Sequence, residues 1–305
     1  MDKIQENLLA EIADLHGVPE GAYNIRSNGV SVQRNCTANI DIETKNDKSG
    51  IDIYIRPGTK NESVHIPVIL DKNGLKEKVY NDFHIGEGAD VVIVAGCGIH
   101  CGGADDMQHD GIHTFYVEKN ARVKYIEKHY GEGDGNGKRV LNPETVIYLA
   151  EGAYMEMEAT QIKGVDSTVR VTKAKVGDNA KLVIHEKIMT HGNQLAKTDF
   201  IVDLDGENSA ANVVSRSVAK DNSKQIFLSN IRGNNKCSGH TECDAIIMDN
   251  ANVSAIPEIV AGNVDASLIH EAAIGKIAGE QLVKLMTLGL TEKQAEEQIV
   301  SGFLR

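Results

Sequence analysis

Three residues in the last quarter of the sequence carry side chains that bind iron or zinc. Cys243 precedes His270 by 27 residues and Glu271 by 28. Thiolate, imidazole and carboxylate groups ligate these metals once they have lost their protons. The separation equals about one period of the repeat described below, so stacking would bring the two segments side by side. A small buried cysteine beside unrelated polar residues is the alternative explanation.

The segment 96–113 is a second candidate metal site. Such a density of ligating side chains is typical of metal-binding tracts. Its cysteine and histidine spacing lacks the C-x₂-C pattern of zinc knuckles. A polar loop that bulges from the body of the protein is the alternative. The candidate ligands are two cysteines, three histidines and three aspartates: Cys97, His100, Cys101, Asp105, Asp106, His109, Asp110 and His113.

The glycine-rich stretch 131–138 resembles a phosphate-binding loop but fails that motif twice. The motif requires Gly at position 132 and Ser or Thr at position 139, where this sequence has Glu132 and Arg139. A flexible turn explains the stretch better. The sequence also lacks a G-x-S-x-G elbow and an H-E-x-x-H pair, so we expect no nucleotide hydrolysis by this chain itself.

The candidate ligands must be positioned by a repetitive β region over residues 30–269. Short strand-like runs alternate there with Gly, Asn and Asp corners. A small residue follows these corners at positions 89, 121, 153, 180 and 209, at separations of 32, 32, 27 and 29 residues. A near-constant period of this size indicates a solenoid. We therefore predict a mainly β protein with a parallel β-helix, favoured over a β-sandwich because two-residue hairpin turns are absent.

Helices are predicted at both ends of the β region. Residues 3–16 have apolar positions at helical spacing. From residue 270 the pattern becomes helical again and stops at Gly289, after which Thr291 and Gln294 form a capping box for a second helix. The expected organisation is an N-terminal helical segment (1–29), a β-helix core (30–269) and a C-terminal helical segment (270–305).

Composition excludes several classes of function. The 305 residues carry a net charge of −12, which disfavours duplex nucleic acid and anionic membrane surfaces as partners. No stretch approaches the roughly 20 apolar residues of a membrane span. The five cysteines are an odd number, and the first residues do not resemble a signal peptide. We therefore expect reduced thiols and a cytoplasmic location.

A family resemblance is carried by residues 240–303. This region is similar to the SufB/SufD family, the scaffold subunits of the SUF machinery for iron–sulfur cluster assembly. The upstream stretch 127–133 also resembles short members of that family, as found in archaea and anaerobic bacteria. The motifs that carry the resemblance are His240-Thr241-Glu242-Cys243-Asp244, Ile256-Pro257-Glu258-Ile259, Ile269-His270-Glu271-Ala272, Ile274-Gly275-Lys276-Ile277, Leu288-Gly289-Leu290 and Ser301-Gly302-Phe303.

The resemblance implies a fold, partners and a site. The family's body is a right-handed parallel β-helix, its C-terminal helices dock onto the ABC-type ATPase SufC, and two scaffold subunits pair through the β-helix. SufB-type chains place at the interface a cysteine and a glutamate, which match Cys243 and Glu271. SufD-type chains present a histidine that matches His270. The sequence is much shorter than bacterial SufB, and we assign no sulfur-accepting role to Cys97 or Cys101.

The resulting hypothesis is a cytoplasmic, non-enzymatic scaffold that carries a transient iron–sulfur cluster. It would act as a homodimer, or as a heterodimer with a SufD-like subunit, together with a SufC-like ATPase. One rival is a polysaccharide-active β-helix enzyme, because solenoid grooves suit extended sugars. The other rival is a structural β-solenoid without a cofactor.

Overall fold

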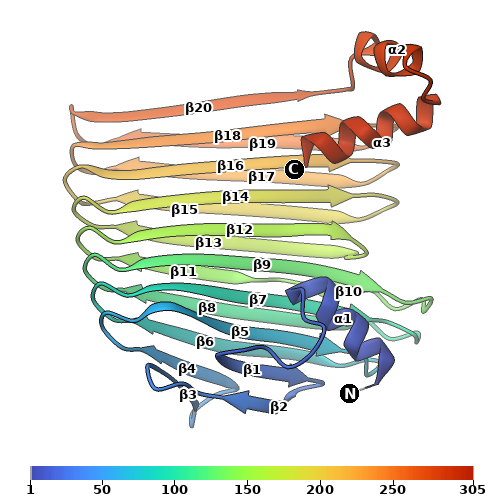
Figure 1. The fold of residues 1–305 in the computed structure, drawn as a ribbon. Coiled ribbons are helices and arrows are strands. Elements are labelled where there is room, and N and C mark those ends of the chain that lie inside the picture. The colour runs from blue at the N-terminus through green and yellow to red at the C-terminus, as the bar shows by residue number, and fades with distance from the viewer. Residues whose placement is uncertain (1, 305) are drawn as a thin grey trace.

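The computed structural model describes residues 2–304, which form a parallel β-solenoid with two facing sheets (Figure 1). In spatial order the first sheet contains β2 (Val30–Asn35), β1 (Ala22–Ser27), β5 (Lys60–Leu70), β7 (Asp90–His100), β9 (Arg122–Glu132), β12 (Tyr154–Lys163), β14 (Lys181–Thr190), β16 (Ser209–Ala219), β18 (Cys237–Ile247) and β20 (Ala266–Gly275). The second contains β19 (Asn252–Ala261), β17 (Lys224–Gly233), β15 (Leu195–Leu204), β13 (Ser167–Val176), β10 (Arg139–Leu141) with β11 (Glu144–Leu149), β8 (Met107–Val117), β6 (Lys76–Ile85), β4 (Gly50–Ile55) and β3 (Ile40–Thr44).

From β5 onward the chain passes alternately between the two sheets, so each coil adds one strand to each sheet. Alternate residues of a strand point into the space between the sheets, as the burial pattern of β15 shows. The repeat residues Ala89, Ala121, Ala153, Ala180 and Ser209 are all buried at coil corners. Three of them directly follow an asparagine in the left-handed conformation. The predicted mainly β solenoid and its corner positions are therefore confirmed.

The N-terminal end of the solenoid is capped. Helix α1 (Lys3–Ala13) packs on the outer face of β5, β7 and β9 (Figure 1). Gly96 and Gly98 make this approach possible, because a Cβ on Gly96 would lie 2.5 Å from the Ile12 carbonyl oxygen. The antiparallel pairs β1–β2 and β3–β4 close the same end. The helix ends at Ala13, earlier than the predicted residue 16, and strand structure already begins at Ala22.

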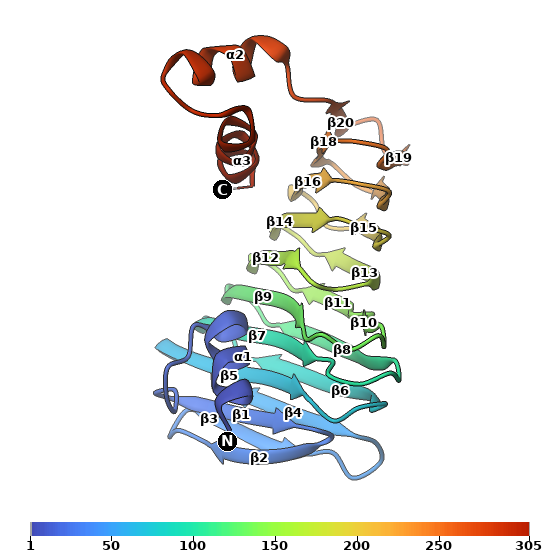
Figure 2. The ribbon, with the colours of Figure 1, turned by 90° about the vertical axis from the view of Figure 1, so that its right-hand side faces the viewer.

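The C-terminal end differs from the expectation of helix from residue 270. Strand β20 continues to Gly275, because its residues extend the parallel ladder with β18. Helix α2 (Gly279–Thr287) then stands away from both sheets, and α3 (Glu292–Phe303) returns toward them (Figure 2). Gly289 has a positive φ of 96°, and the capping box of Thr291 and Gln294 is present, as predicted.

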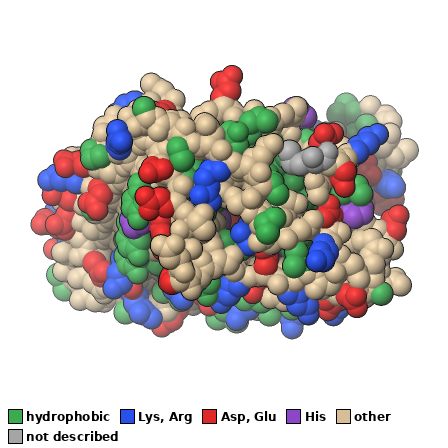
Figure 3. All heavy atoms as spheres, turned by 90° about the horizontal axis from the view of Figure 1, so that it is seen from below, with side chains coloured by type: hydrophobic (Ala, Val, Ile, Leu, Met, Phe, Trp, Pro, Cys, Tyr) green, Lys and Arg blue, Asp and Glu red, His purple; other side chains and the backbone are tan. Residues whose placement is uncertain are grey.

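Two surface properties bear on partners. Seen from the N-terminal end, acidic and basic side chains lie interspersed over the molecule (Figure 3). This face offers no continuous basic footprint for a nucleic acid. Within residues 2–304, every helix is too short or too polar to span a membrane.

Candidate functional site

The predicted ligands lie on the last two strands of the first sheet. In the ladder between β18 and β20, Thr241 is opposite His270, Glu242 is opposite Glu271, and Cys243 is opposite Ala272. Because side chains alternate along a strand, these residues divide between two faces. Cys243 and His270 point into the solenoid, whereas Glu271 points outward. The structure therefore brings the segments together but places Cys243 and Glu271 on opposite faces of the sheet.

The inner part of the site combines a thiol with an imidazole. Cys243 is only 1% exposed. Burial raises its pKa to about 12, and the negative charges of Glu186 and Asp244 add to this effect. Burial also lowers the pKa of His270. His270 Nδ1 shares a hydrogen bond of 2.6 Å with the Thr241 hydroxyl, while its Nε2 is buried without a partner among the described residues. At neutral pH the Cys243 thiol and the His270 imidazole are therefore both uncharged.

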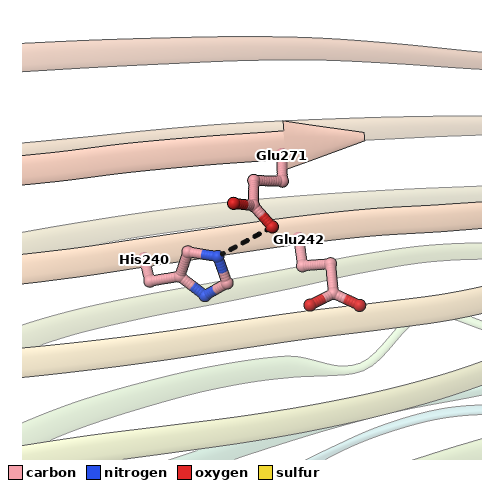
Figure 4. Close-up of side chains that lie close together, drawn as sticks. All are labelled: His240, Glu242 and Glu271. Atoms are coloured by element: carbon pink, nitrogen blue, oxygen red, sulfur yellow. Dashed lines mark ion pairs between the residues drawn. The ribbon is translucent and has the colours of Figure 1, made fainter. Parts of the chain in front are cut away.

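The outer part of the site is formed by His240, Glu242 and Glu271 (Figure 4). One potential ligand atom from each lies within 4.8 Å of the others. His240 Nδ1 lies within hydrogen-bond distance of Asn212 Oδ1, at 3.0 Å, and its Nε2 lies 3.7 Å from Glu271 Oε2, an ion pair when the ring is protonated. One imidazole and two carboxylates form a donor set suited to ferrous iron and similar divalent ions.

Sequence reasoning missed His240 and Glu242 as candidate ligands, although both belong to the motif that carries the family resemblance. The signal that could have found them is the period of two along a strand. Residues 240 and 242 share one face, and register with the next coil adds Glu271 to that face. The solenoid period alone brings Cys243 near His270 and Glu271 without telling which face of the sheet each side chain occupies.

The cysteine- and histidine-rich segment 96–113 is not the bulging loop considered above. Most of it lies in β7 and β8, joined by a short corner. Cys97, His109 and His113 point into the solenoid and line one cavity. His100 instead pairs on the outside with Glu132, at 3.2 Å between Nδ1 and Oε1. Cys101 is buried at the corner, with its thiol toward the Gly103 and Asp105 carbonyl oxygens. The structure thus places three of the five cysteine and histidine candidates, Cys97, His109 and His113, around one cavity.

A buried ionic chain in the interior was also missed. Arg170 is about 1% exposed and forms ion pairs with Glu127 and, at 3.4 Å, with Glu186. Burial alone would raise the pKa of Glu127, but chiefly the Arg170 guanidinium holds it at about 2. Burial raises the pKa of Glu186, which accepts a hydrogen bond of 2.8 Å from Ser215. Ser215 lies opposite Cys243 in the ladder between β16 and β18, so this row of buried polar contacts ends beside the candidate site.

These features define a class: a parallel β-solenoid with a capped N-terminal end, a C-terminal helical pair, and metal-ligating side chains on its last coils. Residues 78–303 match the family model described as SUF system FeS cluster assembly, SufBD core domain. The chain therefore belongs to the SufBD family, and this membership supports a role in iron–sulfur cluster assembly. It lends no support to a polysaccharide-active enzyme.

Curated relatives agree with this assignment. The chain is 32% identical over 263 residues to an iron-sulfur cluster assembly SufBD family protein of Archaeoglobus fulgidus, covering 85% of this chain and 69% of the relative. It is 33% identical over 190 residues to one from Methanocaldococcus jannaschii, covering 62% and 60%. It is 27% identical over 296 residues to one from Pyrococcus horikoshii, covering 96% and 84%. The chain thus spans less than two thirds of the length of some of these relatives, as for the one from Methanocaldococcus jannaschii.

Proposed function

We propose that this protein is a scaffold subunit on which an iron–sulfur cluster is assembled and from which it is transferred. Cys243 and Glu271 are the proposed cluster ligands, with His270 beside them. The observation that carries this proposal is the placement of thiol, imidazole and carboxylate groups on the paired strands β18 and β20 of a SufBD-family chain. Incomplete cysteine ligation leaves a cluster labile enough to be handed on.

The open end of the solenoid supports a paired scaffold. Strands β19 and β20 are each the last of their sheets, so their outer edges are unpaired. Apolar side chains of this last coil are exposed, namely Ile256, Ile259, Val260, Val264, Ile269 and Ile274. Such a surface suits a protein interface. We propose that a second copy docks here, or else a SufD-like subunit, and that β20 shifts so that inner and outer ligands face one cluster.

The C-terminal helices supply a surface for an ATPase partner. Helix α2 has no buried residue, and its Val283 and Met286 are exposed, as is Leu288 just after it. An amphipathic helix with an unpartnered apolar face fits docking to another protein. We propose a SufC-like ABC ATPase as that partner. Movement of the helices during its ATP cycle would be transmitted to the adjoining β20 and would open the site around Cys243.

Anaerobic reconstitution with ferrous iron and sulfide tests the proposal. We expect the wild-type protein to bind both ions and to show the visible absorption of a cluster, and we expect Cys243→Ser to lose most of it. Cys36→Ser is the matched control, because Cys36 is exposed and lies at the opposite end of the solenoid. Equal iron and sulfide content in the wild type and Cys243→Ser would contradict the assignment.

A further inference from the structure

One group of ligating side chains on the outer face of the last coils converges on a single point. Within residues 2–304, His240, Glu242 and Glu271 are the only three His, Cys, Asp or Glu residues whose ligand atoms all lie within 4.8 Å of one another (Figure 4). They leave β18 and β20 on the face opposite Cys243. An ion bound to this outer triad in the single chain would not touch the thiol, so the triad is a site in its own right.

The two carboxylates of the outer triad face each other across the ladder. Glu242 and Glu271 are directly opposite in the register of β18 and β20, and two negative charges held so close repel each other. Val214, the neighbour of Glu242 on β16, offers no counter-charge. Within residues 2–304, the only ion pair of either glutamate is the 3.7 Å contact between Glu271 and His240. The position between the two carboxylates therefore favours a cation.

Protein cations near Glu242 do not cancel this repulsion. Burial and, after it, Asp244 raise the pKa of Glu242, and the opposing effects of Arg216 and His240 are smaller. Asp244 lies two residues further along β18 on the same face, directly opposite Arg216 in the ladder with β16. A bound metal ion would supply the missing positive charge.

The imidazole of the outer triad is oriented from the neighbouring strand. His240 Nδ1 lies 3.0 Å from Asn212 Oδ1, and Nε2 is then directed toward Glu271. Asn212 is the residue opposite His240 in the ladder of β16 and β18, so the backbone register fixes this contact. A hydrogen bond at the far nitrogen is the usual support of a metal-ligating imidazole.

Solvent ions can reach the outer triad. The side chain of Glu271 is 66% exposed, and that of His240 is 33% exposed. Glu242 also forms part of the wall of an open groove of about 400 Å³ on the outer face of the first sheet, together with Glu156, Glu158 and other residues. The site therefore has the entry path that a metal ion needs.

We propose that His240, Glu242 and Glu271 bind one divalent transition-metal ion, with water completing its coordination, and that this ion is ferrous iron held before sulfide arrives. Imidazole and carboxylate ligands suit ferrous iron, manganese and zinc. On binding, the ion replaces the proton at His240 Nε2 when the ring carries one, and that proton leaves to solvent.

The choice of iron and its order of arrival rest on the proposed function, whereas metal binding itself rests on the geometry of the outer triad. Glu271 is also a proposed cluster ligand. An ion loaded on the outer face is therefore already bound to Glu271 when β20 shifts to bring inner and outer ligands together.

Anaerobic titration of the full chain with ferrous iron, without sulfide, tests the outer triad. We expect binding that saturates near one ion per chain and is lost in His240→Gln and in Glu242→Gln. Cys243→Ser changes only the inner face and should retain it. His185→Gln is the matched control, because His185 lies in the same outward row as Glu242 but outside the triad. No binding by the wild type, or equal binding by both triad variants, would overturn the proposal.

Cobalt(II) in place of iron reports the ligand type. We expect weak ligand-field bands without a thiolate charge-transfer band. A strong charge-transfer band that disappears in Cys243→Ser would place the ion on the inner face and contradict the assignment. Asn212→Ala removes only the partner of His240, and we expect it to weaken cobalt affinity by about 10- to 100-fold.

Reconstitution with limiting iron separates loading from the cluster itself. Glu242 is not a proposed cluster ligand, so Glu242→Gln should form the cluster more slowly than the wild type yet reach the same cluster content. Equal rates would contradict the loading role. Iron bound by the outer triad in a protein that forms no cluster with sulfide would support the metal site and contradict the proposed function alone.

Discussion

At the scale of single residues, burial sets the chemistry of the candidate site. The pKa of about 12 for Cys243 means that its thiol keeps its proton at neutral pH until iron or another electrophile displaces it. On the same inner face, the Thr241 hydroxyl of β18 and the His270 ring of β20 are joined by a hydrogen bond. The thiol of Cys243 is therefore shielded in the single chain, and the proposed cluster assembly would need a partner or a strand movement to expose it.

Arg170 is the residue whose loss we expect to be most damaging to stability. Arg170→Met leaves Glu127 charged and buried without its main partner. Breaking a buried pair in this way costs about 3–5 kcal/mol of unfolding free energy. Chemical denaturation measures this cost, and the double variant Glu127→Gln with Arg170→Met should recover much of it. Arg232→Ala is the control, because the Arg232–Asp203 pair is partly exposed and contributes at most about 1 kcal/mol.

The interior histidines predict acid lability. Burial lowers the pKa of His113 from 6.5 to about 4 and that of His129 to about 3. Between these values and pH 6.5 the unfolded chain binds protons that the folded chain does not, so stability falls as the pH falls. Each histidine contributes a slope of up to about 1.4 kcal/mol per pH unit.

Denaturation midpoints measured from neutral pH to about pH 4 check this slope. His129→Gln should make the decline shallower by close to one proton, whereas His16→Gln, at an exposed position, should leave it unchanged. A wild-type slope near zero in this window would show that the histidines are already charged in the folded state.

At the scale of elements, the packing of α1 depends on Gly96 and Gly98, which have no side chains to block its approach. Gly96→Ala places a methyl group 2.5 Å from the Ile12 carbonyl oxygen, so the helix must move outward. We expect a loss of about 1–3 kcal/mol, as for other overpacked contacts, and faster proteolysis within residues 3–13. Gly17→Ala is the matched control, because nothing lies within 4 Å of its added methyl. Equal proteolysis of both variants would show that α1 is not held by this contact.

The elements also show what sequence reasoning could and could not supply. Corner residues and strand periods were sufficient for the solenoid, because each coil repeats the same local requirement. They were not sufficient to tell which side chains of a strand point inward. Val169 is 39% exposed, whereas its neighbour Arg170 is buried. An alternating strand has two possible registers that differ by one residue, and only pairing with other coils selects one. The same ambiguity hid the division of Cys243 and Glu271 between two faces.

The helical boundary near residue 270 was predicted too early for a related reason. The spacing of Ala272, Ala273 and Ile277 fits the apolar stripe of a helix. The free edge of β18, however, pairs with the chain as far as Gly275, so these residues form a strand. Tertiary pairing thus overrides local propensity. The capping signals at Gly289 and Thr291 were reliable because they act within one turn of chain.

At the scale of the whole molecule, the two ends of the solenoid are unlike. The first coils end in antiparallel strand pairs and carry α1 on one face, whereas the last coil leaves apolar side chains exposed. The proposed pairing therefore predicts a dimer in sedimentation or light scattering that Ile269→Lys converts to monomer, because this side chain lies 53% exposed on the last strand. Val169→Lys, at an exposed site in the middle of the solenoid, should remain dimeric. A monomeric wild type would require a different subunit as the partner.

Cluster transfer is the measurement that tests the scaffold account most directly. The wild-type protein, reconstituted anaerobically, is mixed with an apo iron–sulfur acceptor protein in the presence of a ferrous chelator, and acceptor activation is followed over time. The account predicts that the cluster passes to the acceptor faster than free iron and sulfide rebuild it, and that Cys243→Ser gives no transfer above the free-ion rate. A cluster that stays on the wild-type chain, or transfer equally fast from Cys243→Ser, would contradict the account.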